Sequence, residues 1–379
     1  MLMKTYKLGD ICTVVSGSTP KTDNPEFWNG DIKWITPAEI NKESYIINDT
    51  ERKITDVAVK KTGLSSFPTG TVLLSSRAPI GKVAIAGCEM YCNQGFKNLI
   101  CSDAINNKYL YWLLKSKTEF LNSLGRGATF KEISKAIVEN IEIRIPDISC
   151  QEKAVSQFEA ITEAARICQN ELNILNESIN ARFVEMFGDE KNLMPMSDIC
   201  SIITDGTHQP PKFKDTGIPF IFVSNITGDK VTYDAEKFID QDTYDELIKR
   251  TPIEIGDVLL STVGSYGHPA VVKSDKKFLF QRHIAYLKPR REIIDSDYLH
   301  GAILSPDAQR HIEEGVKGIA QKTLNLSEIK KLQIPVPELN RQKEFSTFVS
   351  QVDKSKAVVQ SILDKLNTLL ASLMQEYFG

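Results

Sequence analysis

Two long segments of the chain, 150–188 and 340–379, carry an uninterrupted helical pattern of apolar positions. Counting in sevens from Phe158 reaches Ala165, Leu172, Ile179 and Met186, with a second row at Ile161, Cys168, Leu175 and Arg182. The pattern recurs 191 residues later as Val349, Lys356, Leu363, Leu370 and Tyr377, with Val352, Val359, Leu366 and Leu373. Such a seam predicts helices that pack on one another, each roughly 55 Å long. Two ordinary core helices are the alternative.

The matched length of the two segments favours an antiparallel coiled coil between them. The residues that we expect to form its contacts are Phe158, Leu172, Leu175, Ile179, Val352, Val359, Leu363, Leu366 and Leu370.

The rest of the chain also repeats, as two bodies rich in short β-type runs. "GTVLLSSRAPIG" begins at Gly70 and "GDVLLSTVGSYG" begins at Gly256, so the shared Gly-x-Val-Leu-Leu-Ser predicts a buried strand that enters a turn. "YLYWLLKSKTEFL" from Tyr109 and "YLHGAILSPDAQRHI" from Tyr298 predict helices. We therefore expect an α+β fold with two similar globular domains, 1–149 and 189–339, each followed by one long helix, 150–188 and 340–379, in a pseudo-twofold arrangement.

Composition places the chain among ordinary globular proteins. Of its 379 residues 41% are hydrophobic and 25% are charged, and no apolar run approaches the length of a membrane span. The polar N-terminus lacks a signal-peptide core, so we expect a cytoplasmic protein with no membrane partner. Seven cysteines without metal-site spacing predict neither disulfides nor a metal. The net charge of −3 means that any nucleic-acid contact must come from local patches.

The sequence contains no recognisable catalytic motif. It lacks a phosphate-binding loop that ends in Gly-Lys-Ser/Thr, and it lacks a Gly-x-Gly turn for a methyl donor. Asn24-Pro-Glu-Phe27 is better explained as a turn than as a methyltransferase loop, and Glu51-Arg52-Lys53 has a nuclease-like shape without a partner aspartate. We predict no catalytic residue and no cofactor in this chain.

The end of each body resembles a known family. "GIAQKTLNLSEIKKLQIPVPELNRQKEF" from Gly318 is similar to the exit from a recognition domain in the specificity subunits of type I DNA restriction-modification enzymes, and Asp205-Gly-Thr-His208 is similar to the opening of such a domain. The first copy departs from the pattern, with Ile133-Ser134 and Ala136 in "GATFKEISKAIVENIEIRIPDISCQEK" and "SGSTPKT" without a histidine. The resemblance covers essentially the whole chain.

That resemblance implies a non-catalytic subunit that recognises double-stranded DNA. Each recognition domain would read one half of a bipartite target, while the helices set the spacing and bind two methyltransferase subunits. Restriction subunits would complete the assembly, and the methyl donor, ATP and magnesium would belong to the partners only. A coiled-coil scaffold that binds proteins, a specificity subunit of a related type II-like system, and an enzyme with an unrecognised site are the alternatives.

The loops that differ between the copies are the candidate DNA contacts, because arginine and lysine suit guanine while asparagine and glutamine suit adenine. A solvated turn is the alternative for each residue. The candidates are Thr19, Lys21, Ser76, Arg77, Lys82, Asn93, Gln94 and Lys97 in the first copy, and Thr207, His208, Lys212, Thr262, Ser265, Tyr266, His268, Gln281 and Arg282 in the second. The glycine loops 125–127 and 315–318 fit either a phosphate seat or a helix cap.

Overall fold

The computed structural model describes residues 3–77, 79–127, 131–228, 230–318 and 322–379. Its contacts divide the chain into two compact units, one made of Met1–Ile167 and Ile362–Gly379, the other of Cys168–Ser361. Each unit combines one globular body with one half of each long helix. This division cuts across the predicted segments 150–188 and 340–379, because each helix contributes to both units.

The two predicted long helices are present as α6 (Ile148–Phe187) and α12 (Leu339–Phe378), each of 40 residues. Among the expected packing residues Phe158, Leu172, Val352 and Leu363 are buried, and the other five are partly buried, as the heptad pattern predicts. No helix within the described ranges is apolar enough over a sufficient length to cross a membrane.

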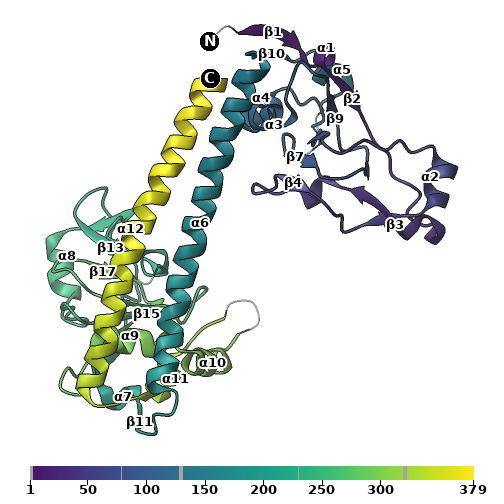
Figure 1. Ribbon diagram of the computed structural model, residues 1–379. Coiled ribbons are helices and arrows are strands. Elements are labelled where there is room, and N and C mark those ends of the chain that lie inside the picture. The colour runs from purple at the N-terminus through teal and green to yellow at the C-terminus, as the bar shows by residue number, and fades with distance from the viewer. Residues whose placement is uncertain (1–2, 78, 128–130, 229, 319–321) are drawn as a thin grey trace. The chain divides into compact units, whose positions relative to one another are not determined.

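Inside each unit the two helices run antiparallel (Figure 1). In unit 1 the first turns of α6 meet the last turn of α12, where the rings of Phe158 and Phe378 stack with centroids 5.5 Å apart. In unit 2 the last turns of α6 meet the first turns of α12. There the guanidinium of Arg182 lies 3.3 Å from the carboxylate of Glu344.

Unit 1 contains three sheets with the strand orders β2-β9-β6-β7-β4, β5-β3-β8 and β1-β10. The strands are β1 (Lys4–Lys7), β2 (Cys12–Val15), β3 (Trp28–Ile35), β4 (Ile46–Ile47), β5 (Lys53–Ile54), β6 (Val72–Leu74), β7 (Val83–Ala86), β8 (Tyr91–Cys92), β9 (Asn98–Cys101) and β10 (Glu142–Ile145). The helices, besides α6, are α1 (Leu8–Ile11), α2 (Asp56–Thr62), α3 (Asn107–Ser116), α4 (Thr118–Ser123) and α5 (Lys135–Glu139), with 3₁₀ turns η1 (Pro25–Phe27) and η2 (Pro37–Glu39).

Unit 2 repeats this plan with the strand orders β12-β18-β15-β16, β14-β13-β17 and β11-β19. The strands are β11 (Leu193–Pro195), β12 (Cys200–Asp205), β13 (Ile218–Ile221), β14 (Lys237–Ile239), β15 (Val258–Ser261), β16 (Pro269–Val271), β17 (Leu279–Phe280), β18 (Ile284–Pro289) and β19 (Gln333–Pro335). The helices, besides α12, are α7 (Met196–Ile199), α8 (Gln241–Leu247), α9 (Ser296–Leu304), α10 (Pro306–Gly315) and α11 (Leu326–Lys331), with the 3₁₀ turn η3 (Val223–Asn225). The α+β expectation is confirmed in both units.

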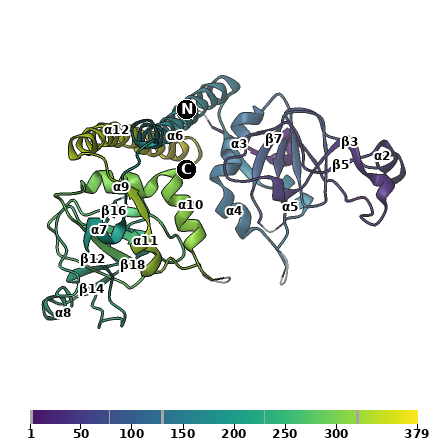
Figure 2. The same ribbon diagram turned by 90° about the horizontal axis from the view of Figure 1, so that it is seen from below.

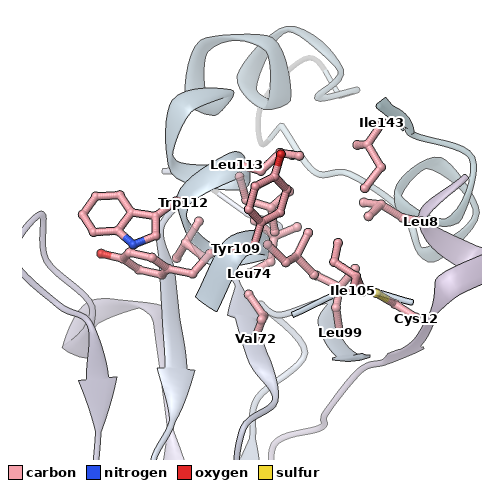
Figure 3. Packing of buried hydrophobic residues seen from close by; sticks show 14 of the residues in the cluster. Leu8, Cys12, Val72, Leu74, Leu99, Ile105, Tyr109, Trp112, Leu113 and Ile143 are labelled. Carbon is pink, nitrogen blue, oxygen red and sulfur yellow. The ribbon is translucent and has the colours of Figure 1, made fainter. Parts of the chain in front are cut away.

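One helix in each unit fills the space between the main sheet and the long helices. In unit 1 this helix is α3, whose apolar side chains join the core shown in Figure 3. In unit 2 it is α9 (Figure 2), which contacts β16 on one side and Phe345 of α12 on the other. The ring of Tyr109 lies 5.2 Å from that of Phe378, and the ring of Tyr298 lies 5.0 Å from that of Phe187. The same ring pair therefore joins each body to a helix end.

The two cores are filled by different but compensating side chains. In unit 1 the large Trp112 packs on Phe158 while the helix carries the small Ala154. At the corresponding positions, 189 and 191 residues later, unit 2 has Gly301 and the large Phe345. A Cβ atom on Gly301 would lie 2.5 Å from the ring of Phe345. The large side chain comes from the helix of the body in unit 1 and from the long helix in unit 2. The core volume is therefore filled in both units, which preserves packing density.

A fully buried glutamine connects each body to its long helix. The Gln151 side chain donates to the carbonyls of Pro146 (2.9 Å) and Ala104 (3.2 Å) and accepts from the amide of Asn106 (2.8 Å). The Gln342 side chain makes the equivalent bonds to Pro337 (2.7 Å), Ile293 (3.1 Å) and Asp295 (2.8 Å). Both glutamines are 0% exposed, so these bonds satisfy groups that water cannot reach.

We predict that Gln151→Ala lowers the free energy of unfolding of unit 1 by about 2–4 kcal/mol, because it leaves buried carbonyl and amide groups without partners. All three tryptophans, Trp28, Trp34 and Trp112, lie in unit 1, so urea unfolding followed by tryptophan fluorescence reports on that unit. Lys153→Ala, a change at an exposed lysine of the same helix within unit 1, should alter the value by less than about 0.5 kcal/mol. Equal effects of the two substitutions would contradict the structural role of Gln151.

Candidate nucleic-acid interface

The repeated Gly-x-Val-Leu-Leu-Ser sequence forms a buried strand that enters a turn, as predicted. β6 and β15 are buried along their whole length. At their ends the hydroxyl of Ser75 accepts from the amide of Lys82, and the hydroxyl of Ser261 accepts from the amide of His268, both at 2.9 Å. Gly81 and Gly267 close the turns at φ of 89° and 80°, where a side chain would be strained. The turn is therefore a common framework, and the residues inside it are free to differ.

In unit 1 the three candidate loops of the first copy meet at the ends of these strands. The hydroxyl of Thr19 donates to the side-chain oxygen of Gln94 at 2.5 Å, which joins the loop of Thr19 and Lys21 to the loop of Asn93–Lys97. The amide of Ser76 donates to the carbonyl of Gly95 at 2.7 Å, which joins the loop of Ser76 and Arg77 to that same loop. Residues that are 75 positions apart along the chain thus form one surface.

An acidic residue holds two of the candidate cations of unit 1. The carboxylate of Glu132 lies 3.0 Å from Nε of Arg77 and 3.3 Å from Nζ of Lys97. The Lys97 amine also donates to the hydroxyl of Ser76 at 3.3 Å. Arg77 stays exposed, whereas Lys97 is buried under the loops.

Three of the candidate DNA contacts have buried side chains. Ser76, Lys97 and Thr262 are 0%, 7% and 5% exposed, because they continue the buried strand ends and bond to neighbouring loops. Thr19, Lys21, Arg77 and Gln94 are exposed, and so are His208, Lys212, Ser265 and Arg282. The remaining candidates are partly buried: Lys82, Asn93, Thr207, Tyr266, His268 and Gln281.

Some partly buried candidates are already bonded elsewhere. The amine of Lys82 donates to the carbonyl of Pro37 at 2.9 Å. The hydroxyl of Tyr266 bonds to Glu313, whose carboxylate also pairs with Lys322 at 2.6 Å. The bonds from Lys322, and then Tyr266, lower the pKa of Glu313 from its ordinary value. His268 lines a separate cavity of about 780 Å³ beside α12 and does not join the loop junction.

Unit 2 brings its loops together in the same way. The amide of Arg282 donates to the carbonyl of Thr207 at 3.1 Å, and the amide of Thr262 donates to that of His283 at 3.0 Å. A cavity of about 280 Å³ opens at this junction, lined by Asp205, Arg282 and His283 among others. Burial, and then the charge of Arg282, lowers the pKa of His283 from its ordinary value. Nε of Arg282 lies 3.4 Å from Nε2 of His283.

The Asp-Gly-Thr-His motif positions a histidine and an arginine at the edge of this junction. The carboxylate of Asp205 lies 2.8 Å from Nε2 of His208 and also bonds to Arg250. The glycine is required because a Cβ at Gly206 would lie 2.3 Å from the carbonyl oxygen of Phe280. In the first copy, a Cβ atom at Gly17 would likewise lie 1.8 Å from the carbonyl oxygen of Cys92. The glycine is shared by the two copies, and the side chains around it differ.

The glycine loops form narrow hairpins beside the junctions. Arg126 pairs with Glu132 through two backbone hydrogen bonds of 3.0 and 2.9 Å, and Lys317 pairs with Thr323 through two of 3.1 and 2.9 Å. Residues 128–130 and 319–321 lie outside the described residues.

Three charged residues of these surfaces were not among the sequence candidates. Arg250 and Glu132 follow no motif that marks them, and only the folded chain brings them beside Asp205 and Arg77. Arg52 belongs to the tripeptide Glu51-Arg52-Lys53, whose pattern resembles a nuclease motif and does not indicate a DNA-reading residue.

Two segments of the chain, residues 2–177 and 189–368, match the family described as "Type I restriction modification DNA specificity domain". The chain belongs to this family. It is accordingly a type I restriction-modification specificity subunit with two target-recognition domains, one in each unit. The family match repeats with the same two-copy layout as the sequence.

Specificity subunits of known systems resemble this one, over most of its length in one case and over about half of it in another. The MjaIX specificity subunit of Methanocaldococcus jannaschii is 31% identical over 376 residues, covering 90% of this chain and 85% of the relative. The EcoBI specificity subunit of Escherichia coli is 29% identical over 177 residues, covering 46% of this chain and 37% of the relative.

Solved structures support the fold. The specificity subunit from M. genitalium aligns with a TM-score of 0.58 at 14% identity, covering 100% of this chain and 96% of that one. A chain from a study of complex assembly and conformational transition of the type I system aligns with a TM-score of 0.63 at 18% identity, covering 99% and 97%.

We predict that Glu132 and Lys97 of this specificity subunit are energetically coupled. Glu132→Gln leaves a buried ammonium without its carboxylate, whereas Glu132→Gln with Lys97→Met removes both charges. A double-mutant cycle on urea unfolding, followed by tryptophan fluorescence, should give a coupling energy of about 1–2 kcal/mol. The exposed pair Glu26 and Lys61 is the matched control and should give less than about 0.5 kcal/mol. Additive effects at Glu132 and Lys97 would contradict the pairing.

Proposed function

We propose that this chain is a non-catalytic subunit in which each unit reads one half of a bipartite double-stranded DNA target. The observation that carries the proposal is the meeting of three loops on the same framework in both units, with different side chains in each. Unit 1 presents Thr19, Gln94 and Arg77 on this surface, and unit 2 presents His208 and Arg282. Different donors and acceptors select different bases.

The long helices set the spacing and bind two methyltransferase subunits, in a complex that restriction subunits complete. Six large apolar side chains on α6 and α12 support a binding role, because they are 45% to 61% exposed: Ile167, Ile174, Val184, Val358, Ile362 and Leu369. Exposed apolar side chains of this size are typical of surfaces that a partner covers. The methyl donor, ATP and magnesium belong to those partners, and we place the complex in the cytoplasm.

We expect sequence-specific methylation only when the chain is produced together with its cognate methyltransferase subunit. Genome-wide mapping of methylated bases should then reveal one split motif with an unspecified middle. The chain alone, given the methyl donor, should methylate no DNA. Methylation by the isolated chain would contradict the non-catalytic role, and unspecific methylation by the complex would favour a protein-binding scaffold.

We further expect the two half-sites to respond independently to substitution. Gln94→Ala in unit 1 should relax one half of the motif, and Arg282→Ala in unit 2 should relax the other half. Each change should reduce methylation of the original motif about 5- to 150-fold, the value of one good base contact. Arg166→Ala, on the exposed face of α6, is the control that should alter neither half. Relaxation of both halves by a single change would argue against two separate readers.

A further inference from the structure

An exposed arginine of unit 1 lies against two tryptophans. The guanidinium carbon of Arg52 is 3.9 Å from the ring centroid of Trp28 and 5.0 Å from that of Trp34. The two indoles meet edge to face, with centroids 5.1 Å apart and planes at 82°. Trp34 is 1% exposed and Trp28 is partly buried, so the rings form a platform anchored in the core of the β5-β3-β8 sheet. Cation–π contact with indole holds a guanidinium well.

The same tryptophans also bond to the loop that carries Thr19 and Lys21. Nε1 of Trp28 donates to the carbonyl of Lys21, and Nε1 of Trp34 donates to the carbonyl of Ser18, both at 3.1 Å. The backbone of Arg52 is fixed as well, since its carbonyl accepts from the amide of Trp34 at 3.2 Å and from the hydroxyl of Thr50 at 2.7 Å. Arg52 therefore shares a rigid support with the loop that carries Thr19.

Within the described ranges, the guanidinium of Arg52 makes no ion pair and no hydrogen bond. This sets it apart from Arg77, which pairs with Glu132, and from Arg250, which pairs with Asp205. Contact with the two indoles restricts the movement of the guanidinium and leaves its N–H donors, within the described residues, without a protein acceptor. An arginine in this state is preorganised for two coplanar acceptors.

The second copy has kept the ring pair and lost the arginine. Phe213 and Phe220 meet with centroids 5.2 Å apart and planes at 65°. Phe220 takes the place of Trp34, because it begins the parallel pairing of β13 with β17 as Trp34 begins that of β3 with β8. The strand neighbour of Phe220 is Lys237, at the position that corresponds to Arg52. Lysine offers a point charge and no planar pair of donors. The aromatic platform is thus common to both units, whereas the planar guanidinium is present at this position in unit 1.

We propose that Arg52 is a specificity-determining residue that reads a guanine of the first half-site through a bidentate contact with O6 and N7. The assignment rests on the proposed DNA-reading role of unit 1. Guanine O6 and N7 are two coplanar acceptors that match the planar guanidinium fork. A phosphate accepts the same fork, and the Arg52→Lys variant and the 7-deazaguanine substitution distinguish the two ligands.

The test uses the complex of the full chain with its methyltransferase subunits. Arg52→Lys keeps the charge and loses the planar fork, and Arg52→Ala loses both. Each should reduce methylation of the original motif about 10- to 100-fold and relax one guanine of the first half-site, while the second half-site stays unchanged. Replacing that guanine by 7-deazaguanine in a duplex should slow the unaltered complex and have no further effect on the Arg52→Ala complex.

Several outcomes would overturn the proposal. The first is a methylation motif that neither variant changes, and the second is a first half-site without guanine. The third is a loss of methylation in Arg52→Ala that is equal on all sequences and absent in Arg52→Lys, because that result marks a phosphate contact. Lys60→Ala, an exposed change on α2 of the same unit, is the matched control and should leave the motif intact. If the unaltered complex yields no split motif, the proposed function fails. If it yields one that Arg52 variants leave intact, only this inference fails.

Discussion

The buried glutamine at the start of each long helix is the constraint on which the rest of the structure depends. Gln151 and Gln342 each bond to a carbonyl at the end of the preceding strand and to backbone groups just before a helix of the body. Because these groups are buried, water cannot replace the hydrogen bonds that the glutamine makes. The glutamine therefore sets where a recognition domain is attached to its helix, and it does so identically in both units.

From that attachment the framework continues through backbone geometry to the loops that carry the candidate DNA contacts. The Ser75 and Ser261 turns are closed by hydrogen bonds to main-chain amides and by glycines at positive φ, and neither depends on the side chains between them. A surface built this way can exchange its side chains without losing its shape. Gly17 and Gly206 serve the same end, since each lets a loop pass close to a neighbouring backbone.

Charge at these surfaces is arranged locally, which agrees with the net charge of −3. Arg77 and Arg250 are each held by a carboxylate, and Arg52 is held by indoles instead. The carboxylates keep the arginines ordered at the cost of offsetting their charge. The indoles order Arg52 without that offset, so the two kinds of support leave different chemistry available to a ligand.

The amino-acid pattern alone determined the repeat, the α+β class, the long helices and the buried strands, because each of these depends on periodicity and local propensity. It also placed the loops that meet at each junction, since those loops are where the copies differ. The exposure of single residues was decided by the tertiary structure: Lys97 and Thr262 are polar in sequence and buried in the fold. Partners far apart along the chain were decided there too, as with Glu132 beside Arg77 and Trp28 beside Arg52. Burial and pairing depend on which distant segments come into contact in the folded chain, and a local sequence pattern does not specify those contacts.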